Sequence, residues 1–599
     1  MIYHCEDHTC NYWDEGEKLP ERCPQCGRKL LRANEADMTG DDWTALGNTL
    51  WDAEASDKKR MVDCFRKAAY LGSAWGVCNL GICMEQGNGV EADPVQAFWL
   101  YQQAVEMGSL NAVCCLGVCY QYGIGTAPDA KQAAELYCKA AEYGSPRGQM
   151  LLARAFHDGI GVEADAAEAV YWVRAAAYQR YGEGMYRLGV CYEYGDGVEQ
   201  NWERAVHWFR EAAESGVSVA MADLGYCYEK GCGVEQSWAQ AFSWYRRGAE
   251  CGYPVSMSNL GLCYKRGYGV DQNWQEAIKW YEQGAQCGDL QSMHNLARCY
   301  ERGEGVEQNE DRALYWYRRS AEGGNGSAMC NLGRCYKRGY GVEQNWQEAV
   351  KWYEQGAQCG NLQSMHNLAC CYEHGEGVEQ NMTEAIRWYT AAAEGGNADA
   401  MHDLGWHYDH GEGVEQDMKK AICWYERAAE QNHPAAMNSL GECYAMGRGV
   451  PRDLETAMEW YRRAAELGEA MADYNMGWHL EQAGKLSEAY AHYRKAADGN
   501  DDSAWWALGR FYENGVVVAQ DGKEARRCYE TGEKLGSVKC KMRLARCKLL
   551  GIGGRREKKA GLDLCRQALE LAKESSEKED YGYEAEMNLL RRTIAENES

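Results

Sequence analysis

The chain has 599 residues and a formal net charge of −26, which argues against a nucleic-acid partner because such binding needs a basic face. No segment approaches the roughly 18 consecutive apolar residues of a membrane span, and the opening MIYHCEDHTCNYW lacks the basic and apolar regions of a secretory signal. We therefore expect a cytoplasmic protein without a membrane partner, whose 29 cysteines are reduced thiols or metal ligands.

The first 33 residues contain two pairs of cysteines, spaced C-x4-C and C-x2-C with twelve residues between the pairs. The four are Cys5, Cys10, Cys23 and Cys26. Four thiolates complete a tetrahedral shell with no open position, so the spacing predicts one structural zinc ion per chain. A segment this short also needs such a metal to fold. The alternative is a disordered tail with free thiols.

The second pair lies in CPQCG, which resembles the knuckle of a zinc ribbon or a rubredoxin. The first pair has four intervening residues where the commonest knuckle has two, so His4 or His8 is an alternative ligand. A redox role for CPQC is disfavoured because no βαβ pattern surrounds it. We interpret residues 1–33 as a zinc-ribbon-like segment.

A leucine recurs every 36 residues along nearly all of the remaining chain. Twelve units are in strict register, and their marker residues are Leu80, Leu116, Leu152, Leu188, Leu224, Leu260, Leu296, Leu332, Leu368, Leu404, Leu440 and Met476. Outlying copies at Leu46, Leu508 and Leu544 bring the number to fifteen. A fixed period of this size predicts a solenoid, in which each unit buries its apolar face only against its neighbours.

The unit at Leu260 illustrates the expected local structure. Leu260 and Gly261 belong to the apolar face of a first helix, and the recurring glycine indicates a backbone too close to allow a Cβ atom. Gly267 ends this helix in the left-handed conformation. Asn273 begins a second helix as its N-cap, with Glu276 placed for a capping box. Each unit is therefore a helix–loop–helix hairpin.

The recurring pattern LGxxYxxGxGVxxD/N…A…WYxxAAExG resembles the Sel1-like repeat, a longer-looped relative of the tetratricopeptide repeat. The resemblance covers residues from about 40 to 570 and implies an all-α superhelical solenoid. It further implies a non-catalytic scaffold or adaptor that presents a groove to a protein or peptide. It implies no small-molecule substrate.

Departures from the pattern suggest the domain boundaries. We expect Sel1-like repeats over residues 34–475 and further repeats, the first with a shortened loop, over 476–570. A capping helix follows at 571–599, since open solenoid ends need a polar cover. Residues 261–308 and 333–380 match at 42 of 48 positions, which indicates an internal duplication.

An asparagine precedes the marker leucine in several units, at Asn79, Asn259, Asn295, Asn331 and Asn367. The position lies beside the buried stripe of the first helix, and it resembles the place where tetratricopeptide domains bind a peptide through asparagine. We therefore take these five residues as candidate partner-binding residues. The alternative is that they satisfy polar groups of the adjacent repeat.

The cysteines and histidines allow two competing functions. Some cysteine-rich Sel1-like proteins resemble β-lactamases or penicillin-binding proteins, but those pair cysteines at a short fixed spacing that is missing here. A metal or thiol buffer is suggested by the cysteine number alone. Nine cysteines stand three residues after the marker of an in-register unit, as Cys263 does, and are interpreted as helix packing. His402, His407 and His410 are interpreted as surface or partly buried side chains.

Overall fold

The structure is a computed structural model and describes residues 2–5, 13–15, 30–33, 38–51, 55–578 and 584–598. Its first described segments form a small antiparallel sheet of β1 (Ile2–Cys5), β2 (Trp13–Glu15) and β3 (Leu30–Ala33), in the order β2-β1-β3. Cys5 pairs with Leu30 across β1 and β3. All regular structure described beyond this sheet is helical.

The residues described beyond this sheet form thirty-one helices, and the chain divides into two compact units, Met1–Gln308 and Asn309–Ser599. In the first unit the first helices of the repeats are α1 (Gly40–Thr49), α3 (Ala74–Gln86), α5 (Leu110–Tyr122), α7 (Pro146–Asp158), α9 (Gly182–Tyr194), α11 (Ser218–Lys230), α13 (Pro254–Arg266) and α15 (Leu290–Arg302). Its second helices are α2 (Ala55–Tyr70), α4 (Pro94–Glu106), α6 (Ala130–Glu142), α8 (Ala166–Tyr178), α10 (Trp202–Glu214), α12 (Trp238–Glu250) and α14 (Trp274–Gln286).

The second unit continues the alternation. Its first helices are α17 (Gly326–Arg338), α19 (Leu362–His374), α21 (Ala398–His410), α23 (Pro434–Met446), α25 (Ala470–Gln482), α27 (Asp502–Asn514) and α29 (Val538–Leu550). Its second helices are α16 (Glu310–Glu322), α18 (Trp346–Gln358), α20 (Met382–Glu394), α22 (Met418–Glu430), α24 (Leu454–Glu466), α26 (Leu486–Asp498), α28 (Gly522–Lys534) and α30 (Lys558–Lys578). A last helix, α31 (Glu584–Glu598), packs against α29 and α30.

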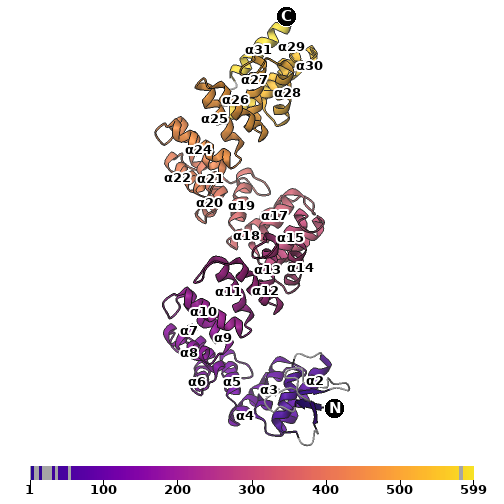
Figure 1. The fold of residues 1–599 in the computed structure, drawn as a ribbon, viewed down its shortest axis with the longest axis vertical. Coiled ribbons are helices and arrows are strands. Elements are labelled where there is room, and N and C mark those ends of the chain that lie inside the picture. Colours follow the sequence, from indigo (N-terminus) through magenta and orange to yellow (C-terminus); the bar gives the residue numbers. More distant parts are fainter. Residues whose placement is uncertain are drawn as a thin grey trace. The chain divides into compact units, whose positions relative to one another are not determined.

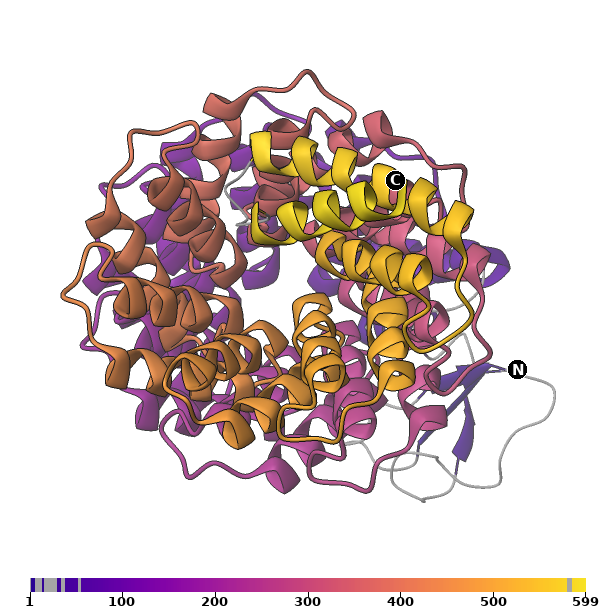
Figure 2. The same ribbon diagram turned by 90° about the horizontal axis from the view of Figure 1, so that it is seen from above.

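Within each unit the hairpins follow one another in chain order, and each helix packs against its neighbours in sequence (Figures 1 and 2). Several consecutive first helices also touch directly, such as α3 with α5 and α13 with α15, whereas no two consecutive second helices among the described residues do so to a comparable extent. The first helices therefore lie on the inner side of each unit's curve. In each unit we call the surface formed by its first helices, α3 to α15 in the first unit and α17 to α29 in the second, the first-helix face. The predicted all-α solenoid of about fifteen units is confirmed.

The repeat core consists of an aromatic ring packed against a glycine. Leu260 and Tyr281 are fully buried, and a Cβ atom added to Gly261 would lie 2.5 Å from the ring of Tyr281. The close approach expected at this glycine therefore exists, but its main partner is an aromatic side chain and not a backbone. The same pairing recurs, for example at Gly405 and Tyr425. Cys263 is 2% exposed, as expected of a packing residue.

The loop of each hairpin depends on two glycines with positive φ. Gly267 has φ of 74° and caps α13 by donating its N–H to Cys263 O, as predicted. Gly269 has φ of 70°, and a Cβ atom there would collide with the carbonyl oxygen of Trp238 in the preceding second helix. Asn273 accepts a hydrogen bond from the N–H of Glu276 at 3.1 Å. This hydrogen bond confirms the predicted N-cap, but the reciprocal hydrogen bond of a capping box is missing. Among the described helices, only α1 has a complete capping box, at Thr39.

No helix among the described residues is both long and apolar enough to cross a membrane. The shortened unit turns at residues 483–485, between α25 and α26, with Gly484 at φ of 76°.

Candidate functional site

Neighbouring first helices are joined by pairs of polar side chains on the first-helix face. In each pair, one residue lies two positions before the marker of its repeat, and its partner lies one position before the marker of the next repeat. The two residues are therefore 37 positions apart in the sequence, and they meet because consecutive first helices stack with this offset. The pairs are Cys78 with Cys115, Tyr186 with Asp223, Cys330 with Asn367, His366 with Asp403, His402 with Ser439, and Asn438 with Asn475. We call them cross-repeat pairs. They place chemically diverse groups along the first-helix face of each unit.

The five candidate asparagines lie one per repeat on α3, α13, α15, α17 and α19 and do not gather into one site. Asn79 is buried and donates to Asn48 Oδ1 at 2.8 Å. Asn367 donates to Cys330 Sγ at 3.4 Å, and Asn295 accepts from Gln291 at 3.2 Å. The remaining two, Asn259 and Asn331, are half-buried. Their role in partner binding stays a prediction.

Only part of the candidate zinc site belongs to the described residues. Cys5 is the last residue of β1, and His4 precedes it. Cys10, Cys23 and Cys26, together with His8, lie outside the described residues. The zinc ion stays a prediction.

A cavity of about 750 Å³ opens between α7 and α9 in the first unit. Its floor is formed by buried apolar side chains of α8, namely Ala169, Val170 and Val173. Its rim carries the exposed side chains of Arg154 and Arg187. The cavity is thus apolar inside and charged at its mouth, as in many ligand and peptide sites.

The cavity coincides with two departures from the repeat: Val173, and Ala153, which stands where the neighbouring repeats carry Gly117 and Gly189. Val173 stands where the preceding and following repeats carry Tyr137 and Phe209, which are buried aromatic core residues. Valine is smaller than either ring and leaves the space between neighbouring first helices unfilled. The WV dipeptide at Trp172, in place of the usual WY, was therefore a sequence signal for this cavity that pattern reading missed.

The cavity is lined by three arginines, Arg147, Arg154 and Arg187, and by three carboxylates, those of Asp158, Glu183 and Asp196. Asp158 forms ion pairs with Arg154 at 3.3 Å and with His157 at 2.6 Å. In contrast, the guanidinium of Arg147 donates to a neutral amide, that of Asn111, at 2.6 Å. Arg187 has no hydrogen bond or ion pair within the described part of the chain. Two guanidinium groups at the cavity therefore lack a carboxylate partner.

Arg147 also contacts the cross-repeat pair of cysteines next to the cavity, with 3.5 Å between its Nη1 and Cys115 Sγ. A hydrogen bond from Cys78 and the charge of Arg147 lower the pKa of the Cys115 thiol to about 7, although burial opposes this change. The hydrogen bond to Cys115 and burial raise the pKa of Cys78. The pair therefore has one acidic and one protonated thiol, both of them buried.

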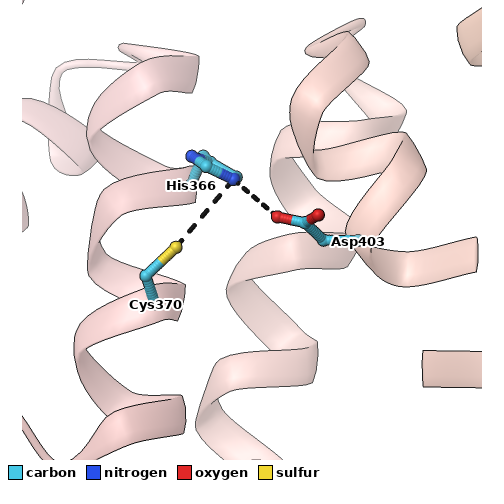
Figure 3. Close-up of side chains that lie close together, drawn as sticks. All are labelled: His366, Cys370 and Asp403. Atoms are coloured by element: carbon cyan, nitrogen blue, oxygen red, sulfur yellow. Dashed lines mark hydrogen bonds and ion pairs between the residues drawn. The ribbon is translucent and has the colours of Figure 1, made fainter. Parts of the chain in front are cut away.

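In the second unit a cluster of ionisable groups joins α19 to α21. His366 Nε2 lies 2.9 Å from Asp403 Oδ2 and 3.9 Å from Cys370 Sγ (Figure 3). Burial disfavours the charged imidazole, but hydrogen bonds with Asp403 and Cys370 raise the pKa of His366 to about 10. His366 and His402 together lower the pKa of the Asp403 carboxyl well below its usual range, against the effect of burial.

Sequence reasoning placed the histidines of this region at the surface or partly buried. His402 is half-buried and His410 is exposed, but His407 is 1% exposed, so that interpretation is wrong for His407. His366 and Cys370 follow the i, i+4 spacing of one helical face, a signal that was visible in the sequence and was overlooked.

Comparison with known families identifies the repeat. The Sel1 repeat model matches fourteen segments, residues 76–109, 112–145, 146–181, 182–217, 218–253, 254–289, 290–325, 326–361, 362–397, 398–433, 434–469, 470–501, 504–537 and 538–573. No curated protein matches the chain significantly.

One solved structure supports the same assignment, and a second shows sequence similarity over part of the chain. The chain is 32% identical to c5321, described as a protective antigen of uropathogenic Escherichia coli strains with an SLR fold, and the match covers 75% of this chain and 97% of c5321 with a TM-score of 0.53. A Sel1 repeat protein from Oxalobacter formigenes is 31% identical over 41% of this chain and 96% of its own, with a TM-score of 0.37.

Proposed function

Because the chain belongs to the Sel1 repeat family, whose solenoids are generally protein-interaction scaffolds and typically non-enzymatic, we propose that it is a non-catalytic adaptor that binds a peptide segment of another protein. The cavity between α7 and α9 on the first-helix face is the docking point. Repeat solenoids commonly use their concave surface in this way.

The observation that carries the proposal is the combination of an apolar floor with two guanidinium groups that lack a carboxylate partner. The floor around Val173 accepts an apolar side chain of the peptide, since burial of such a chain yields about 1.5–3 kcal/mol. Arg147 and Arg187 select a carboxylate beside it, because arginine forms strong bidentate hydrogen bonds with carboxylates. The occupant is therefore a peptide with an acidic residue next to an apolar one.

A random peptide library selected against the full chain tests this function. We expect enrichment of peptides that combine Asp or Glu with an aliphatic or aromatic residue. Arg187→Glu should weaken the selected peptides by about 10-fold or more, because it removes one charge-assisted contact of about 1.5–3 kcal/mol. Arg246→Glu on the second helix α12 makes the same charge change at an exposed site outside the cavity and is the matched control.

Equal weakening by both variants would indicate a general charge effect and contradict docking at the cavity. Failure to enrich any peptide class would contradict the adaptor function in this form. Circular dichroism of both variants confirms that the helices remain folded.

We also propose one structural zinc ion held by Cys5, Cys10, Cys23 and Cys26. Two observations support it: β1 and β3 pair Cys5 with Leu30, and only three residues separate Leu30 from Cys26 in the sequence. Four thiolates suit zinc, and such a site is closed, so the ion would stabilise the segment and supply no open coordination position. Metal analysis of the purified chain tests the stoichiometry.

A further inference from the structure

We propose that His366, Cys370 and Asp403 form a second metal site, which binds a divalent ion of the zinc class on the first-helix face of the second unit. One atom of each residue, the His366 Nε2, the Cys370 Sγ and an Asp403 carboxylate oxygen, lies within 4.8 Å of the other two. Two ligands come from α19 and the third from α21, so that the metal would join adjacent repeats (Figure 3).

The distances are close to those of a bound zinc ion. Bond lengths of about 2.0–2.3 Å in a tetrahedral shell place ligand atoms about 3.3–3.6 Å apart. His366 Nε2 lies 2.9 Å from Asp403 and 3.9 Å from Cys370. The third pair, Cys370 Sγ and an Asp403 carboxylate oxygen, lies within 4.8 Å. Side-chain shifts of up to about 1 Å would therefore complete the site. An imidazole, a thiolate and a carboxylate together suit zinc better than magnesium or calcium, which prefer oxygen ligands alone.

Neighbouring groups already orient the three ligands, as is usual around metal sites. Tyr389 donates a hydrogen bond to Cys370 Sγ at 3.2 Å. His402 Nδ1 lies 3.0 Å from the second carboxylate oxygen of Asp403, and the amide nitrogen of Gln363 lies 3.2 Å from His366 Nδ1. The Asp403 side chain is 35% exposed, so solvent reaches the site and a water molecule or a partner's side chain can take a fourth position.

The internal duplication provides a natural comparison within the chain. His294 occupies the position of His366 in the sister repeat, but Arg298 stands in place of Cys370. The residue equivalent to Asp403 is Asn331. Cys370 is thus one of only six differences between the two duplicated segments of 48 residues, whereas the Asp403 position lies outside those segments.

Cobalt(II) is the probe for the test, because its thiolate complexes absorb in the near ultraviolet and its tetrahedral complexes absorb in the visible. The full chain is used with Cys5, Cys10, Cys23 and Cys26 changed to serine, which removes the N-terminal thiolates. We expect one cobalt ion per chain with a single-thiolate absorption band, and displacement of the cobalt by equimolar zinc.

In this background Cys370→Ser should abolish the thiolate band, and Asp403→Asn should weaken zinc binding more than about 10-fold, since even the loss of a supporting group around a site costs about 10–100-fold. The matched control, His294→Asn, should leave both readouts unchanged. Cys370→Ser changes one atom at a half-buried position, and circular dichroism checks its fold. A thiolate band that survives Cys370→Ser, or no stoichiometric binding in the background chain, would overturn the proposal.

Discussion

The cavity between α7 and α9 makes Val173→Tyr the most informative single substitution. The preceding repeat shows where the new ring would lie, because Tyr137 is 1% exposed and donates its hydroxyl to Gln121 at 2.7 Å. Ala153 stands where that repeat has a glycine, but Ala297 and Tyr317 occupy the same two positions in another repeat, where the ring is fully buried. His157 occupies the position of Gln121 one repeat later, so the hydroxyl of a tyrosine at residue 173 has a partner within reach. A tyrosine ring buries roughly 60 Å² more apolar surface than valine, which at about 25 cal/mol per Å² stabilises the repeat by about 1.5 kcal/mol.

Two measurements follow this substitution. Hydrogen exchange of the amides in α7 to α9 should slow by about 10-fold, since about 1.4 kcal/mol corresponds to a factor of ten in the opening equilibrium. The affinity for peptides selected against the full chain should fall by at least about 10-fold, because the ring fills the space that the peptide side chain occupies.

Phe209→Tyr is the control, because it adds the same hydroxyl where a ring is already present. Its peptide affinity should stay unchanged. If Val173→Tyr is folded, exchanges more slowly and still binds the selected peptides with full affinity, the cavity is not the docking point.

Three further predictions concern individual residues. Asp501 caps α27 but is only 8% exposed, and burial raises the pKa of its carboxyl from 3.8 to about 6 although the Ala504 N–H donates a hydrogen bond to it. The protonated carboxyl therefore contributes stability that is fully present below pH 3.8 and is lost as the pH rises through about 6. Asp501→Asn keeps the cap and removes the charge, so it should raise the midpoint of urea unfolding at pH 7 by the equivalent of about 1–3 kcal/mol and have little effect near pH 4. An equal gain in stability at both pH values would refute the role of the charge. Asn367→Ala should lower the stability of α17 to α19 in hydrogen exchange by about 1 kcal/mol through loss of the Cys330 pair. Asn259→Ala should leave exchange unchanged and weaken only those peptides that are long enough to extend from the cavity to α13, and the reverse pattern would contradict this division. Changing Cys5, Cys10, Cys23 and Cys26 to serine, which removes the N-terminal zinc ligands alone, should leave the circular dichroism of the repeats unchanged, because solenoid contacts are local. A loss of helix in this variant would show that the repeats depend on the N-terminal ion.

The sequence alone determined the architecture. A marker residue every 36 positions was sufficient because each repeat packs only on its neighbours, so the local pattern already contains nearly all the contacts that stabilise the fold. The ends of the helices were predictable from the sequence for the same reason. Gly267 and Asn273 act through backbone conformation and a hydrogen bond across three residues, and neither depends on distant parts of the chain.

The partner of each packing residue was harder to predict. The recurrence of Gly261 indicated a close approach, but only the packing of the hairpin shows that the ring of Tyr281 makes it. The valine at residue 173 and the i, i+4 spacing of His366 and Cys370 are both visible in the sequence as departures from the repeat. A consensus pattern does not predict such features, because it retains only the residues that the repeats share.

Only the tertiary structure decided which side chains meet across repeats. The rotation and translation between consecutive hairpins set an offset of 37 residues, and this brings Asp403 to His366 and Cys115 to Cys78. A hydrophobic period in the sequence indicates that the helices stack. The offset between residues that meet in neighbouring repeats depends on how the aromatic rings and small residues of the core pack together. That arrangement is a property of close packing in three dimensions and has no counterpart in the linear pattern.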